Sequence, residues 1–157
     1  MAIAPNQVSQ NTSHQALYTQ DFYLWIDQAM SLLREGNLKE LDLENLLEEI
    51  EDMCSSQKSA LESNLEAILM HLLKYKYQQN KRSSSWRYTI IEHRRRLYKA
   101  FKKSPSLKKY FLEEFADAYA GARKLAAVET EISIDTFPLE SPFTPEQVLN
   151  EDYLPED

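Results

Sequence analysis

Residues 42–78 read DLENLLEEIEDMCSSQKSALESNLEAILMHLLKYKYQ, and the longest predicted helix of the chain lies here. From Leu43 onward its apolar residues recur at steps of three and four, as they do on one face of an α-helix. Asp42 is a suitable N-cap for that helix. The pattern predicts one helix over 42–78, with Ser55-Ser56 as the place for a kink or a break.

Three further main helices are predicted around this one, over 21–34, 85–103 and 107–128. Asp21 is a cap for the first, and Gly36 is a natural stop after it. A proline follows the second within two residues, and the residue before a proline avoids helical geometry. The second and third helices are therefore expected to be separate.

The C-terminal stretch 129–157 has a different character, because prolines are spread among aromatic and aliphatic residues. Thr144 followed by Pro145 is a typical helix start and predicts a short helix over 145–150. We expect the stretch to lie as a strap over the helices.

The amino-acid composition also favours a fold built from helices. The chain has 157 residues, the size of one domain, and its only glycines are Gly36 and Gly121. Hairpins and phosphate-binding loops need glycine at tight turns. The predicted fold class is therefore all-α, a helical bundle of four main helices with one long helix and a C-terminal strap of prolines and aromatics. We expect a single helical domain over 18–155, after a polar and disordered start at 1–17.

No stretch has the apolar core of a signal peptide or the ~20 apolar residues of a membrane span. We therefore expect a cytoplasmic protein that does not enter the membrane. Cys54 is the only cysteine, so it cannot form an intramolecular disulfide, and its helical spacing predicts a buried position.

An ordered set of short motifs carries a resemblance to a known family. The motifs are DFYLWI at 21–26, LDLENLLEEIE at 41–51, HLLKYKYQ at 71–78, SSWRYTIIEHRRR at 84–96 and TFPLESPFTPEQVLNEDYLP at 136–155. In this order they closely resemble the domain-of-unknown-function family numbered 29, a bacterial family common in cyanobacteria. The resemblance implies an all-helical fold and a bacterial cytoplasmic home, and it implies no activity.

Charge is strongly segregated along the chain. The stretch from Lys74 to Lys109 holds thirteen Lys or Arg and one acid, Glu92, and thus carries a net charge of +12. The rest of the chain carries −19, with acids concentrated in 40–52 and 129–157. Two hypotheses follow from this segregation.

In the first hypothesis, the basic helix pairs with acids of the same protein, within one chain or across a dimer. Arg94 falls on the apolar side of its predicted helix, where a charge needs a partner or access to water. Glu48 and Glu51 are the predicted partners, because a guanidinium binds a carboxylate through two hydrogen bonds.

In the second hypothesis, the same segment binds nucleic acid or another polyanion, with aromatic residues available to stack on bases. No named nucleic-acid-binding motif is present. The candidate binding residues are Lys74, Lys76, Arg82, Trp86, Arg87, Arg94, Arg95 and Arg96.

A third hypothesis is a metal-dependent nucleotide phosphohydrolase. Glu48, Glu51 and Asp52, with Glu114 and Asp117, resemble in outline the acidic pairs that hold magnesium in all-helical nucleotide pyrophosphohydrolases. Spacings of this kind also arise by chance in an acidic chain, and none of the three histidines has metal-ligand spacing. We predict no catalytic residue, no metal site and no cofactor.

The leading prediction is a non-enzymatic protein-interaction or regulatory module. A helix over 42–78 would extend ~55 Å at ~1.5 Å per residue, more than a compact domain of this size spans. We expect either a bend near Ser55 or a second copy that covers the overhang, and therefore a homo-oligomer or a protein partner.

Overall fold

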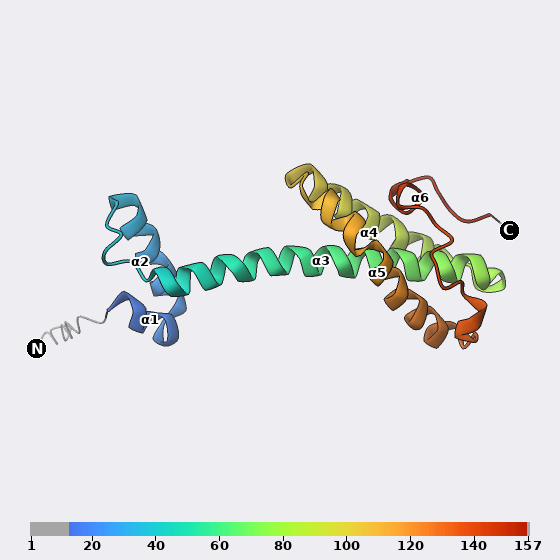
Figure 1. The fold of residues 1–157 in the computed structure, drawn as a ribbon, viewed down its shortest axis with the longest axis horizontal. Coiled ribbons are helices and arrows are strands. Elements are labelled where there is room, and N and C mark those ends of the chain that lie inside the picture. Colours follow the sequence, from blue (N-terminus) through green and yellow to red (C-terminus); the bar gives the residue numbers. More distant parts are fainter. Residues whose placement is uncertain (1–12, 157) are drawn as a thin grey trace, which may run out of the picture. The chain divides into compact units, whose positions relative to one another are not determined.

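The computed structural model describes residues 13–156, all of which are helical, turn or coil, without a strand (Figure 1). The predicted all-α class is confirmed. The packing divides into two compact units, one ending at Cys54 and the other beginning at Ser55. We call them unit 1 and unit 2, a division that the predicted single domain over 18–155 did not anticipate.

The longest helix, α3, runs from Leu43 to Tyr77 and crosses the boundary between the units. It agrees with the helix predicted over 42–78. The helix is continuous through Ser55 and Ser56, so the predicted break is not observed there.

Unit 1 contains α1 (His14–Gln20), α2 (Phe22–Glu35) and the first part of α3. The Asp21 side chain accepts a hydrogen bond from the Leu24 amide at 3.0 Å, and α2 ends at Gly36 with φ at 71°, in the left-handed region. These are the start and stop that the sequence predicted for α2.

The helix α1 begins inside the stretch predicted to be disordered, 1–17. That prediction is wrong for residues 13–17, which cap and form the start of α1, whereas residues 1–12 lie outside the described part of the chain. The reason is a local polar network that a search for apolar periodicity does not detect.

This network surrounds Trp25, whose side chain is 1% exposed. The His14 ring stacks on the indole, its Nε2 donates to the Trp25 carbonyl at 2.8 Å, and its Nδ1 accepts from the Asp42 amide at 3.0 Å. The indole Nε1 donates to the Asp42 carboxylate at 3.1 Å, and the side-chain amide of Asn45 donates to the same carboxylate at 2.7 Å. Burial alone would raise the pKa of Asp42, but these hydrogen bonds outweigh burial and lower it.

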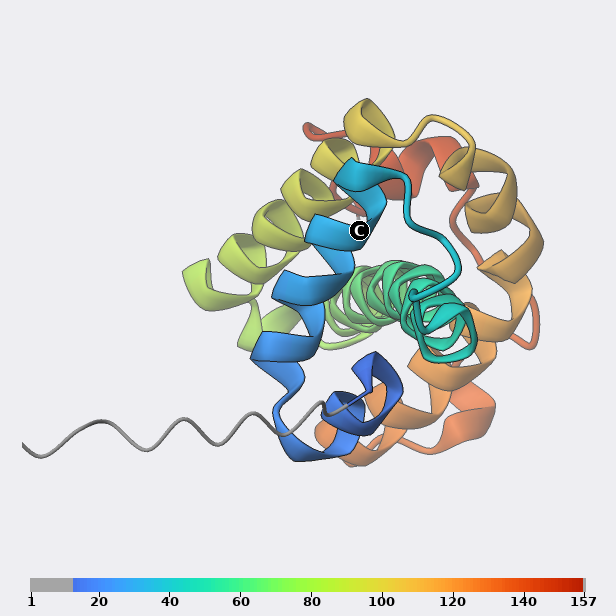
Figure 2. The same ribbon diagram turned by 90° about the vertical axis from the view of Figure 1, so that its left-hand side faces the viewer.

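Unit 2 contains the rest of α3, α4 (Ser84–Lys103), α5 (Leu107–Thr130) and the short α6 (Pro145–Leu149). Two 3-10 turns, η1 (Gln79–Lys81) and η2 (Ile134–Thr136), lie in the connections. In Figure 2 the view runs nearly along α3, and α4 and α5 lie on different sides of it. The helices predicted over 85–103, 107–128 and 145–150 thus agree with the structure to within two residues.

The core of unit 2 forms where α3, α4, α5 and the C-terminal segment meet. Every one of these elements contributes side chains that are almost fully buried, such as Leu65, Leu97, Ala122 and Val148, each 0% exposed. Burying such side chains is the main favourable contribution to folding. Unit 2 therefore has an apolar core of its own.

The C-terminal segment 131–156 is the predicted strap, and it packs on this core through Phe137 and Phe143. Polar side chains of α5 hold its backbone. Arg123 donates to the Phe137 carbonyl at 2.8 Å, and the Tyr119 hydroxyl donates to the Pro138 carbonyl at 2.6 Å. The strap is therefore part of unit 2.

Candidate interaction surfaces

The first part of α3 exposes a row of apolar side chains in unit 1. Leu43 and Leu47 are each 57% exposed, Ile50 49% and Met53 63%. Exposed acids lie between them on the same helix. We call this set the acidic surface; it consists of Leu43, Leu47, Ile50 and Met53 with Glu44, Glu48, Glu51 and Asp52.

Most of this row follows the register of the buried part of α3. At about 100° per residue, Leu43, Leu47 and Ile50 fall within about 60° of one another around the helix. Leu61, Leu65 and Ile68 fall in the same sector, and those three are 2% exposed or less. The apolar side chains on this face of α3 are thus buried in unit 2 and exposed in unit 1.

The helix α2 adds half-exposed apolar residues to unit 1, with Phe22, Ile26, Met30 and Leu33 between 37% and 48% exposed. Cys54 is also exposed, so the prediction that it is buried is wrong. Cys54 lies on the face of α3 that is buried further along the helix, but no described residue packs against this part of it. Exposed apolar rows of this kind, bordered by charge, are typical of protein-interaction sites.

The helix α4 in unit 2 exposes a second row of apolar and aromatic side chains, and this row is bordered by cations. Tyr88 is 68% exposed, Ile91 55% and Tyr98 61%, although the sequence pattern counts Ile91 and Tyr98 among the apolar positions of this helix. We call this row with its exposed cations the basic surface; it consists of Tyr88, Ile91 and Tyr98 with Arg87, Arg95, Lys99 and Lys102. Among the described residues these four cations make no ion pair.

Three of the eight predicted binding residues lie exposed on α4, namely Arg87, Arg95 and Arg96. Arg96 forms an ion pair with Glu92 one turn earlier, at 3.3 Å. An exposed pair of this kind contributes little to stability, about 0.3–0.5 kcal/mol. These arginines are therefore available to a partner.

Arg94 points the other way, into unit 2, and is 3% exposed. It does not pair with Glu48 or Glu51, and that prediction is wrong within the chain. Its guanidinium donates to backbone carbonyls of the strap, those of Val148 and Tyr153 at 2.8 Å, Gln147 at 3.2 Å and Glu151 at 3.5 Å.

The physical reason is that these carbonyls lie at and beyond the C-terminal end of α6, where no helical N–H satisfies them and where a cation is favourable. Burial lowers the pKa of Arg94 to about 10, so that it still holds its proton at neutral pH. Arg94 is a structural anchor of the strap. Glu48 and Glu51 remain exposed on the acidic surface.

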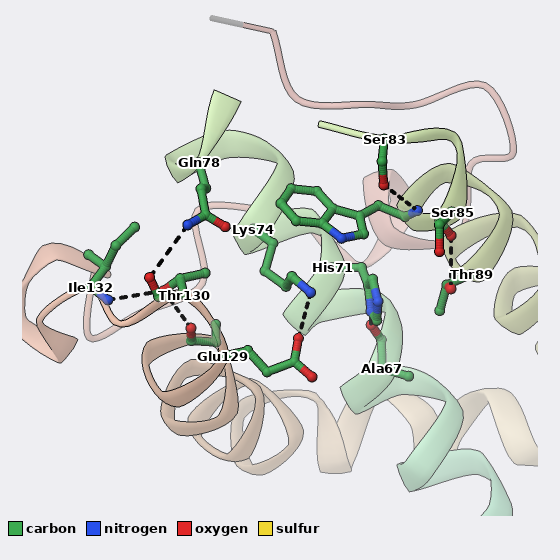
Figure 3. Close-up of polar contacts among 12 residues, drawn as sticks. Ala67, His71, Lys74, Gln78, Ser83, Ser85, Thr89, Glu129, Thr130 and Ile132 are labelled. Atoms are coloured by element: carbon green, nitrogen blue, oxygen red, sulfur yellow. Dashed lines mark hydrogen bonds and ion pairs between the residues drawn. The ribbon is translucent and has the colours of Figure 1, made fainter. Parts of the chain in front are cut away.

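Lys74 and Trp86 also serve the interior of unit 2. Figure 3 shows the Lys74 ammonium directed at the Glu129 carboxylate. These two groups form an ion pair at 2.5 Å, and the Lys74 ammonium also lies 4.5 Å from the centre of the Trp86 ring. The hydrogen bond from Lys74 lowers the pKa of Glu129. A basic residue of the 74–109 stretch thus pairs with an acid of the 129–157 stretch, as the internal-pairing hypothesis expected in general terms.

Arg82 lies against Tyr75 near the turn that joins α3 to α4. Its Nε donates to the Tyr75 carbonyl at 2.7 Å, and its guanidinium stacks on the Tyr75 ring at 4.4 Å. Lys76 is half-buried on the last turn of α3. The predicted binding residues therefore do not form one surface, because several are committed to internal contacts.

A hollow of about 560 Å³ opens beside the basic surface, between α4, the start of α5 and the strap. Phe101 and Leu149 supply apolar lining. Lys102 and Lys108 line it together with Arg94, Tyr98 and Glu151. Two residues of the basic surface, Tyr98 and Lys102, thus border a cavity with an apolar lining and a predominantly cationic border.

The two remaining histidines sit in local contacts within unit 2. The Nδ1 of His71 donates a hydrogen bond to the Ala67 carbonyl at 2.9 Å (Figure 3). The Nδ1 of His93 donates to the side-chain oxygen of Asn64 at 2.7 Å. Burial lowers the pKa of both rings. In residues 13–156, no three His, Cys, Asp or Glu side chains come together as a metal site would require, so the phosphohydrolase hypothesis finds no site in this part of the chain.

No helix in the described part of the chain is both long and apolar enough to cross a bilayer. The fold and these two surfaces define an all-α protein with an acidic and a basic exposed helix face. The chain belongs to the family called Domain of unknown function DUF29, whose model matches residues 17–154. The resemblance noted from its motifs is thereby confirmed. No match was found among curated proteins or among solved structures.

Proposed function

We propose that this protein is a non-enzymatic protein-interaction module that associates with a second copy through the acidic surface. The observation that supports this most directly is the uncovered row of Leu43, Leu47, Ile50 and Met53. Covering such a row yields roughly 25 cal/mol per Å² of apolar area, which is the usual driving force of association.

The test is the molar mass in solution as a function of protein concentration, measured by sedimentation. The wild-type chain of 18.4 kDa should form a dimer or a larger assembly, and Leu47→Glu with Ile50→Glu should shift it to the monomer. Leu112→Glu is a matched control, because Leu112 is 58% exposed on α5, outside both surfaces, against 57% for Leu47. A wild-type chain that stays monomeric at every concentration would contradict the proposal.

Polyanion binding is a second candidate function. It is favoured by the cations of the basic surface, which make no ion pair within residues 13–156 and lie beside exposed Tyr88 and Tyr98, since aromatic rings stack on unpaired bases. Binding of a labelled single-stranded oligonucleotide should then weaken steeply with salt, through counterion release. Anisotropy that does not change even at low salt would remove this candidate.

A further inference from the structure

The acidic and basic surfaces are complementary in both charge and apolar pattern. Each is a row of exposed apolar side chains on one helix, bordered by carboxylates in one case and by cations in the other. Among residues 13–156, the charged side chains of neither surface form an ion pair. Each surface therefore has the chemistry that the other needs in a partner.

The two rows also match in length. Leu43 to Met53 and Tyr88 to Tyr98 each span ten residue steps, or about 15 Å at 1.5 Å per residue. On α4 the residues Tyr88, Ile91, Arg95, Tyr98 and Lys102 follow steps of three and four, so they form a stripe of the kind that packs against a second helix.

We infer that the acidic surface of one copy docks on the basic surface of a second copy. This inference rests on the proposed function, and it names the site on the partner. In a two-fold dimer each copy supplies one surface of each kind, so the contact forms twice and the two buried areas add. Carboxylates such as Glu48 and Glu51 then face Arg95 and Lys99 of the partner copy.

The hollow next to Tyr98 and Lys102 gives this contact a place to anchor. Its lining of Phe101 and Leu149 accepts an apolar side chain, and Lys102 and Lys108 at its border attract carboxylates. An apolar side chain between acids is what the acidic surface presents at Ile50, which precedes Glu51. Side chains that fill pockets near the centre of an interface usually contribute most of its binding energy.

The alternative of acidic surfaces packing on each other is disfavoured by charge. Residues 40–52 contain seven acids and no Lys or Arg, so two such segments side by side would repel one another. Docking on α4 replaces this repulsion by attraction. It also makes self-association and polyanion binding compete for the same cations.

The experiment is charge reversal with complementation, followed by sedimentation. Variant A carries Glu48→Lys and Glu51→Lys, and variant B carries Arg95→Glu and Lys99→Glu. All four positions are exposed, and Glu and Lys have similar helix propensities, so both variants should keep the wild-type circular dichroism and thermal transition.

Each variant alone should self-associate at least about tenfold more weakly than the wild type, because like charges then face each other at both contacts. An equimolar mixture of A and B should associate as the wild type does, since opposite charges face each other again at both contacts. Wild-type association should also weaken about tenfold or more from about 50 mM to about 500 mM salt.

The other outcomes separate the two proposals. If the wild type associates, A associates more strongly and B is unchanged, the acidic surfaces pack on each other, which overturns this inference and leaves the proposed function standing. If the wild type is monomeric throughout, both fail. If A and B both self-associate as the wild type does and B alone loses oligonucleotide binding, the basic surface is a polyanion site only and the docking inference is overturned.

Discussion

Removing the Arg94 guanidinium should destabilise unit 2 by releasing the strap. Its donors reach four carbonyls, and the three bonds of 3.2 Å or shorter are of full strength. A carbonyl that loses its partner in a buried site costs about 1–3 kcal/mol, and relief of the buried charge offsets part of that loss. For Arg94→Met we therefore expect a decrease of about 3 kcal/mol in the free energy of unfolding.

The assay is guanidinium chloride unfolding followed by tryptophan fluorescence in a Trp25→Phe background. Only Trp86 remains there, and it lies in unit 2, so the signal reports on that unit alone. Arg96→Met is the matched control; Arg96 lies two residues away, is exposed and is not part of the basic surface, and its removal should change stability by less than about 0.5 kcal/mol. Equal stability of the two variants would refute the anchoring role of Arg94.

Three further predictions concern single residues. Asp42→Ala should destabilise unit 1 by about 1–3 kcal/mol, because the indole loses its acceptor; the assay is Trp25 fluorescence in a Trp86→Phe background. With Asp42 in place this contribution persists above pH 3.8, the ordinary pKa of Asp, and fades only as pH falls below it. Burial raises the pKa of Tyr119 from 10 to about 12, so wild-type stability should fall as pH rises from 10 to 12, and unfolding of Tyr119→Phe should show a smaller fall. Gly36→Ala should cost about 1 kcal/mol in the same Trp25 assay, because φ is 71° there; no loss would mean that α2 ends differently.

The helices could be predicted from the sequence because caps, stops and apolar spacing are local properties. Asp21, Gly36 and Thr144 each sit where the structure places a helix end. Exposure could not be predicted in the same way. Leu47 and Leu61 have the same spacing pattern, yet one is 57% exposed and the other 2%, because periodicity identifies the face of a helix and carries no information about what covers it.

The candidate site illustrates a second limit. A charge on the apolar side of α4 correctly marked Arg94 as needing a partner, but its acceptors are backbone carbonyls more than fifty residues later. Every residue has a carbonyl, so no side-chain pattern identifies the right one. The exposure of Ile91 and Tyr98 was missed for the opposite reason, since their spacing counts them among the apolar positions of α4, whereas both are more than half exposed.

The most direct test of the docking of the acidic surface on α4 uses Cys54, the single cysteine, which is exposed and follows Met53. A maleimide–diazirine reagent on Cys54 is photoactivated in an equal mixture of nitrogen-14 and nitrogen-15 copies, and cross-linked peptides are identified by mass spectrometry. If the acidic surface docks on α4 of a second copy, mixed-isotope cross-links should join Cys54 to residues 84–103. Cross-links that join Cys54 to 43–54 of the second copy, or that never combine the two isotopes, would contradict this docking.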